Sequence, residues 1–156
     1  MTLLAHLVAL LAILSTGIVY GTDAFCALVQ RSALARVDDA TLTAVMGNLH
    51  GVADRRMPVP GILGVVAAGT AAVLAAVAGH AAAAATAGAA FVLLVVWTLL
   101  YVRISAPINR RLTAAADAHE TPADVRAWQR DWDRIIVPRA VLQGLAVLAL
   151  GVSLIS

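Results

Sequence analysis

The sequence contains no lysine, a single cysteine and few aromatic residues, and only 13% of its 156 residues are charged. Soluble domains carry about a quarter charged residues, so this deficit excludes an ordinary soluble domain. Because Cys26 is the only cysteine, an internal disulfide is excluded as well. The formal net charge is only +2 and the arginines are flanked by acids, which excludes the electrostatic footprint of a nucleic-acid-binding protein.

Apolar residues dominate what remains. Hydrophobic residues make up 62% of the chain, and its mean hydropathy is +0.90. A helix needs about 20 apolar residues to cross a hydrocarbon core about 30 Å thick. The start lacks the basic region and the small-residue cleavage site of a signal peptide, so we expect the first span to be retained. The sequence therefore predicts an all-α four-helix transmembrane bundle, one membrane domain with spans at about residues 3–29, 60–79, 87–106 and 135–155.

The arginines indicate the orientation of this bundle. All of them except Arg139 lie in two of the connections between spans, loop one (residues 23–59) and loop three (residues 103–134). The link between spans two and three and both termini have none. Arginine-rich loops remain on the cytoplasmic side of a membrane. We therefore expect a multi-pass protein of the cell membrane with loops one and three in the cytoplasm and both termini outside.

Loop one has helical periodicity of its own. Apolar residues recur at helical spacing over residues 42–53, after Asp38 or Asp39 as a potential N-cap. Arg55 and Arg56 favour the C-terminal end of such a helix. The pattern predicts an amphipathic helix in loop one on the cytoplasmic side.

Loop three carries a second helical pattern. Thr121 followed by Pro122 has the features of a helix start, and Trp128 and Trp132 lie one turn apart after it. This predicts a short, tryptophan-containing helix near the membrane surface. The two tryptophans would either stack on an aromatic ligand or serve as ordinary anchors at the membrane interface.

An acidic residue interrupts the first apolar stretch. Thr16, Tyr20 and Asp23 are spaced i, i+4 and i+7, so they share one side of a helix. Ionisable residues inside a span usually face the bundle interior. The alternative is that the membrane ends at Tyr20 and Asp23 is an exposed interfacial acid. The apolar segment AFCALV that follows favours a buried Asp23, at one wall of a pocket.

His50 and Asp54 lie at i and i+4 on the predicted loop-one helix. A carboxylate at this spacing orients an imidazole as a base or shares a metal with it, and Asp23 is the candidate third ligand. The alternative is a solvated pair on a helix surface. Gly47 and Gly51 form a small-xxx-small pair beside them, which predicts close approach of another helix or a ligand.

Arg139 lies just inside the fourth span. An arginine at that depth should pair with an acid or bind an anionic or phenolic group, unless its side chain extends to the interface.

Motifs around the third loop have a recognisable arrangement. APINRRL follows the third span, RAWQRDWDR comes next, and VPR opens the fourth. In these motifs the chain resembles the anthrone oxygenase-like integral membrane proteins, which have a P-x-N-x-x-L turn after span three, a W-x-x-x-W helix and an arginine near the start of span four. Family members often have a histidine where this chain has Ile136. The matching positions are Pro107, Asn109, Leu112, Trp128, Trp132 and Arg139.

The resemblance implies oxygenation of an activated phenolic carbon in a polyketide-like aromatic substrate, as in the conversion of an anthrone to an anthraquinone. A base removes a proton from the acidic carbon and the resulting anion reacts with dioxygen, so no organic cofactor is required. The base would be His50 or a desolvated Asp23. Asn109 and Arg139 would stabilise the developing phenolate. The candidate substrate-binding residues are Thr16, Tyr20, Trp128, Trp132 and Arg139.

Other functions remain open at this point. A single iron or copper ion held by Asp23, His50 and Asp54 would activate dioxygen directly, and this ligand set suits iron better than copper(I). The second class of function is non-enzymatic: an accessory subunit of the membrane, or a protein that binds a small hydrophobic ligand. The absence of internal repeats disfavours a transporter, unless the protein forms a homo-oligomer.

Overall fold

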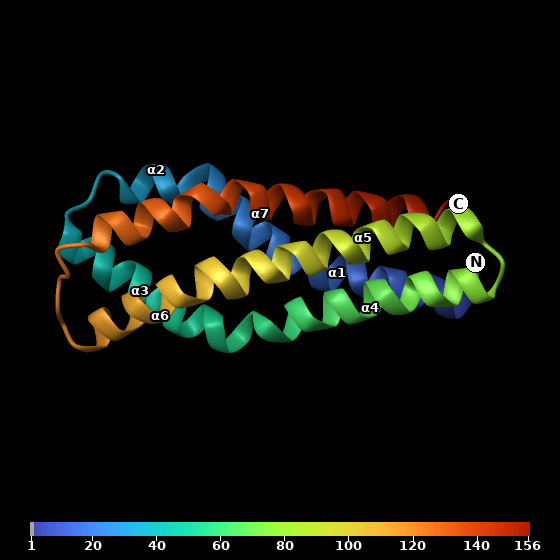
Figure 1. The fold of residues 1–156 in the computed structure, drawn as a ribbon, viewed down its shortest axis with the longest axis horizontal. Helices are drawn as coiled ribbons and strands as arrows, with labels where there is room; N and C mark the ends of the chain where they lie inside the picture. The colour runs from blue at the N-terminus through green and yellow to red at the C-terminus, as the bar shows by residue number, and fades with distance from the viewer. Residues whose placement is uncertain (1) are drawn as a thin grey trace.

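The protein is a bundle of long helices. The computed structural model describes residues 2–156, in which there is no strand. Four helical segments are long and apolar enough to cross a membrane, which confirms the predicted all-α four-helix bundle and makes the chain a multi-pass membrane protein by length and composition. Figure 1 shows these segments running along the long axis of the molecule. They are Leu3–Leu34, Pro58–Val77, Ala81–Asp117 and Val125–Ser153.

The first and third segments are each interrupted by a π-helical turn. The first consists of α1 (Leu3–Phe25), a π turn (Cys26–Gln30) and α2 (Arg31–Leu34), so the helix continues past Asp23 as predicted. Single π turns inside α-helices occur frequently at functional sites. The third segment consists of α5 (Ala81–Leu100), a π turn (Tyr101–Ser105) and α6 (Ala106–Asp117).

Two sequence-based predictions about loop three are wrong. The helix that carries both tryptophans is not a separate element, because α7 (Val125–Ser153) runs from its Asp124 N-cap position through Pro138 into the fourth span. Thr121 therefore does not cap it. No glycine or other stop signal lies between Asp124 and Pro138, so the helix continues and the proline is accommodated inside it. The P-x-N-x-x-L motif is likewise not a turn: it lies in the first half of α6, where Pro107 occupies a position that tolerates the missing N–H.

The loop-one helix is present as predicted. It is α3 (Asp39–Arg56), and the Asp38 side chain caps it by accepting a hydrogen bond of 2.7 Å from the backbone N–H of Thr41. Only Met57 separates it from α4 (Pro58–Val77). In Figure 1, α3 and α6 lie at one end of the bundle, whereas both termini and the α4–α5 turn lie at the other.

Helix α3 packs directly on α6 through Gly47. A Cβ atom at this position would lie 2.4 Å from both the Cβ of Ala116 and the carbonyl oxygen of Leu112. The close approach lets the Thr113 hydroxyl donate a hydrogen bond of 3.1 Å to the Gly47 carbonyl. The expected role of the small-xxx-small pair is thereby confirmed, and Gly51 faces the same Thr113 side chain.

The Gly47→Ala variant is expected to lose about 1–3 kcal/mol of unfolding free energy, because the added methyl group overlaps backbone that cannot move aside. Gly88→Ala is the matched control, since nothing lies within 4 Å of a Cβ there. That control should be neutral or gain up to about 1 kcal/mol from helix propensity. Denaturant unfolding of both variants in detergent micelles tests this. Equal changes in the unfolding free energy of the two variants would contradict the close packing of α3 on α6.

Packing differs along the bundle. In the half that contains the termini, the spans meet through small side chains and fit closely, with Ala9, Ala12, Ala68, Ala71 and Ala87 fully buried. In the half that contains α3, larger side chains form a second core around Leu42, Met46, Leu112 and Ile136. A cavity lies next to this second core.

Candidate functional site

The cavity has a volume of about 380 Å³ and lies among α1, α3, α4, α5, α6 and α7. Most of its wall is apolar, and a few polar groups converge on it. Small-molecule sites typically have this size and this composition. The charged, imidazole, amide and aromatic side chains in its wall are Asp23, His50, Asp54, Trp97, Tyr101, Asn109, Trp132 and Arg139.

A buried ion pair forms one side of the cavity. Arg139 Nη2 donates to Asp23 Oδ1 at 2.9 Å, and the two side chains are only 6% and 5% exposed. The other carboxylate oxygen of Asp23 accepts hydrogen bonds from Gln143 Nε2 at 2.6 Å and from Trp97 Nε1 at 3.3 Å. The acid expected to pair with Arg139 is therefore Asp23, and Asp23 faces the bundle interior rather than the interface.

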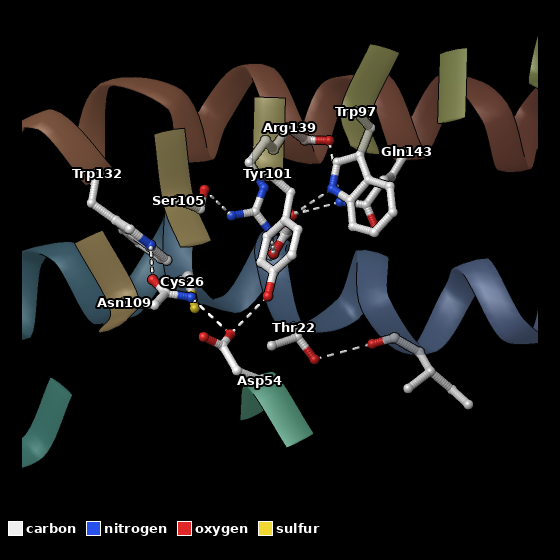
Figure 2. A network of polar contacts seen from close by, with 12 residues as sticks. Thr22, Cys26, Asp54, Trp97, Tyr101, Ser105, Asn109, Trp132, Arg139 and Gln143 are labelled. Carbon is white, nitrogen blue, oxygen red and sulfur yellow. Dashed lines mark hydrogen bonds and ion pairs between the residues drawn. The ribbon is translucent and has the colours of Figure 1, made fainter. Parts of the chain in front are cut away.

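Arg139 is held from several directions. Its Nη1 donates to the Ser105 hydroxyl at 2.7 Å, and its guanidinium carbon lies 5.5 Å from the centre of the Tyr101 ring and 6.0 Å from that of Trp97. Figure 2 shows this arrangement, with Tyr101 between the arginine and Asp54. The Nε of Arg139 is buried and makes no hydrogen bond within residues 2–156. The cation is thus fixed in place while one donor remains unpaired.

A second polar network connects α3 to the spans. Asp54 Oδ1 accepts hydrogen bonds of 2.9 Å from the Tyr101 hydroxyl and from Asn109 Nδ2. Asn109 Oδ1 in turn accepts from Trp132 Nε1 at 3.1 Å (Figure 2). The amide of Asn109 is therefore engaged on both its oxygen and its nitrogen. In this structure it positions Asp54 and Trp132.

His50 is the least satisfied polar group of the site. It is 3% exposed, its Nε2 has no hydrogen-bond partner among residues 2–156, and its ring lies 5.5 Å from that of Trp132. Burial lowers the pKa of His50 to about 4, against the opposing effect of Asp54 and with a smaller contribution from the charge of Arg139. The imidazole is therefore neutral near pH 7, and one of its nitrogens is an acceptor.

Acid is expected to destabilise the protein through His50. The unfolded histidine titrates at 6.5 and the folded one at about 4, so the unfolded chain binds the extra proton first. The contribution of the neutral imidazole to the free energy of unfolding is complete above about pH 6.5 and is lost as the pH falls toward 4. Its total is on the order of 3 kcal/mol. Unfolding measured across this range should show a weaker pH dependence for His50→Gln than for the wild type. Identical curves would contradict the low pKa.

Three of the residues predicted to bind substrate lie elsewhere. Thr16 faces α4, where a Cβ on Gly64 would lie 2.7 Å from its hydroxyl, and Tyr20 lies against Gly144 of α7. Trp128 lies beneath the guanidinium of Arg111, whose central carbon is 5.8 Å from the ring centre. Along the first segment the cavity reaches only the last turns of α1 and the start of the π turn after it, where Val19, Thr22, Asp23 and Cys26 form the wall. Of the five, Trp132 and Arg139 line the cavity.

The metal site considered for Asp23, His50 and Asp54 does not fit this geometry. Within residues 2–156, no three histidine, cysteine, aspartate or glutamate side chains are placed to share a metal ion. Asp23 is bound to Arg139, Gln143 and Trp97, whereas Asp54 is bound to Tyr101 and Asn109. The two carboxylates thus belong to separate networks, because Asp23 is turned toward donors on the third and fourth segments and Asp54 toward donors on the third segment alone.

Sequence reasoning missed half of these networks, although a signal was present. Trp97, Tyr101, Ser105 and Asn109 recur every fourth residue along the third segment, and Gln143 follows Arg139 by four. A polar or aromatic stripe at helical spacing inside an apolar span indicates a side that faces the bundle interior. The π turn at Tyr101–Ser105 lies within this stripe.

Comparison of the chain with protein-family models, curated proteins and solved structures finds no match. Three properties of the cavity bear on its function: an apolar wall, a fixed cation and a neutral imidazole with an unpaired nitrogen.

Proposed function

We propose that the protein is a membrane-embedded oxygenase that acts on a small phenolic or polyketide-like aromatic compound. The observation that carries this proposal is His50, a buried neutral imidazole with an unpaired Nε2 in the wall of an apolar cavity that also contains Arg139. A base and a cation around an apolar space match the needs of a reaction through a phenolate-type anion. The resemblance to the anthrone oxygenase-like proteins in the motifs from Pro107 to Arg139 supports the same reaction class.

The reaction balances without an external electron donor. His50 takes a proton from the acidic CH₂ carbon between two aromatic rings, and the remaining electron pair is delocalised onto the oxygen of the ring carbonyl, which becomes a phenolate-type oxygen. This carbon then gives its electrons to dioxygen and forms a C–O bond. The proton returns from His50 to the peroxide, and loss of water leaves a ketone. In sum, CH₂ and O₂ become C=O and H₂O, and the substrate supplies all the electrons.

The other polar residues have supporting roles in this proposal. Arg139 stabilises negative charge on this phenolate-type oxygen, and its own position is set by Asp23 and Ser105. Asn109 is a positioning residue, since it holds both Asp54 on α3 and the Trp132 ring against which His50 lies.

The lining of the cavity supports a hydrophobic substrate that arrives from the bilayer. Ile62 and Val66 of α4 and Val102 after α5 line the cavity and are also 65%, 58% and 53% exposed on the outside of the bundle. Exposed aliphatic side chains on a spanning helix contact lipid. A compound dissolved in the membrane would therefore reach the cavity between these helices. We further propose that the arginine-bearing end, with α3, faces the cytoplasm and that both termini lie outside.

Oxygen uptake tests the proposal. The purified protein in lipid vesicles is given anthrone, and uptake is compared with that of empty vesicles, because anthrone also oxidises slowly without a protein. With isotopically labelled dioxygen, the proposal expects one labelled atom in the ketone and the other in water. A second function is favoured because Asp23 is already paired with Arg139 and Asp54 with Asn109, which would suit a protein that binds a hydrophobic ligand without turnover. Binding of anthrone with no uptake above empty vesicles would establish that function instead.

A further inference from the structure

A second cavity lies against the first. It has a volume of about 370 Å³ and is formed by the last turns of the first segment and the C-terminal half of α3. The two cavities share part of their walls, so they adjoin each other. The shared residues are Thr22, Cys26, Leu49, Ala53 and Met57.

The chemistry of the second cavity differs from that of the first. Its lining contains no acid, and its one charged residue is Arg56. The polar amide of Gln30 is already engaged, since it accepts from the Cys26 thiol at 2.7 Å and donates to Met46 Sδ at 2.8 Å. Arg56 is exposed on α3 and forms no ion pair within residues 2–156. The second cavity thus offers apolar surface and one unpaired cation.

The positions on α3 relate the two cavities to each other. His50 lines the first cavity and Arg56 the second, and the step of six positions from one to the other corresponds to about 9 Å along the helix axis. Leu49 and Ala53 lie between these two sides of the helix and contact both cavities. A molecule of two or three fused rings with a polar group at each end has this length.

We propose that the two cavities form one two-part site for an aromatic acid. The phenolic end of the molecule lies in the first cavity beside His50 and Arg139, and an anionic carboxylate at the other end is bound by Arg56 in the second. This inference rests on the proposed function for the phenolic end, and it narrows the substrate class from hydrophobic phenols to phenols that carry an acid group. Arginine binds carboxylates through charge-assisted hydrogen bonds, which gives the site its preference.

Two matched probes test the inference by binding alone. One is a hydroxynaphthoic acid whose hydroxyl and carboxyl groups are at opposite ends of the ring system, and the other is the corresponding naphthol without the carboxyl group. Affinities are measured with the protein in phosphatidylcholine vesicles. Arg56→Gln should weaken binding of the acid about tenfold and leave binding of the naphthol unchanged. Arg55→Gln is the control, because Arg55 is the neighbouring arginine, donates from Nε to the Gly51 carbonyl, and does not line the second cavity. It should change neither affinity.

Several results would overturn the inference. If Arg56→Gln weakens binding of both probes equally, Arg56 only supports α3. The inference also fails if Arg56→Gln changes the affinity of neither probe, or if neither probe binds to the wild type. Loss of acid binding on addition of phosphatidylglycerol would show that Arg56 instead binds a lipid phosphate. The proposed function is tested separately. If the acid binds through Arg56 but the protein takes up no oxygen, only the proposed oxygenase function is wrong. If the protein takes up oxygen but does not discriminate between the probes, only the two-part site is wrong.

Discussion

Replacing Asp23 with asparagine is expected to lower the free energy of unfolding by about 3–5 kcal/mol. The side chain keeps its size but loses its charge, and Arg139 then remains as an unpaired cation that is only 6% exposed. Gln143 and Trp97 cannot compensate, because both donate hydrogen bonds and offer no negative charge. The cost comes mainly from the stranded charge and not from the lost attraction, since a buried pair gains little over two neutral groups.

A second substitution separates these two contributions. In the double variant, Asp23→Asn with Arg139→Gln, no unpaired charge remains, so its stability loss should be clearly smaller than the sum of the two single losses. Asp131→Asn is the control, because its pair with Arg134 has side chains 56% and 76% exposed and should contribute less than about 1 kcal/mol. Denaturant unfolding in micelles gives all four values. Strictly additive losses would show that Asp23 and Arg139 are not coupled.

His50→Gln is expected to reduce protein-dependent oxygen uptake by about a hundredfold, the lower end of the usual contribution of a general base, because the low pKa of His50 makes it a weak base. Glutamine is polar and of similar size, and it fills the space beside Trp132, but it cannot take up a proton at neutral pH. The binding affinity for naphthol should change little, because most of the cavity wall is apolar and untouched. Loss of turnover with retained binding is the result that separates a base from a structural histidine.

His80→Gln provides the comparison for this experiment. His80 lies in the α4–α5 turn at the opposite end of the bundle, so its substitution should leave uptake unchanged (Figure 1). Full uptake by His50→Gln, with the protein folded, would remove His50 as the base and with it the basis of the proposed oxygenase. Equal losses in both histidine variants would point to a general effect on folding.

The local pattern of the sequence was sufficient to predict the spanning helices and α3. Long apolar runs predict spanning helices because the bilayer requires a helix of fixed minimum length, and the capping residue Asp38 with the apolar spacing after it predicts α3. The burial of Asp23 followed from the apolar segment after it, and the need of Arg139 for an acid followed from its depth. These properties depend on neighbours in the chain or on the solvent, and both can be inferred from sequence.

Only the tertiary structure decided which side chains meet. The rotation of each helix about its axis depends on packing against its neighbours, so Thr16 and Tyr20 turn toward α4 and α7 while Asp23 turns toward Arg139. The same rotations place Asp54 among donors from the third segment, away from Asp23, which separates two carboxylates that sequence spacing alone had allowed to share a metal. The pairing of Arg139 with Asp23 depends on contacts between residues far apart in the chain, and so does the unpaired nitrogen of His50.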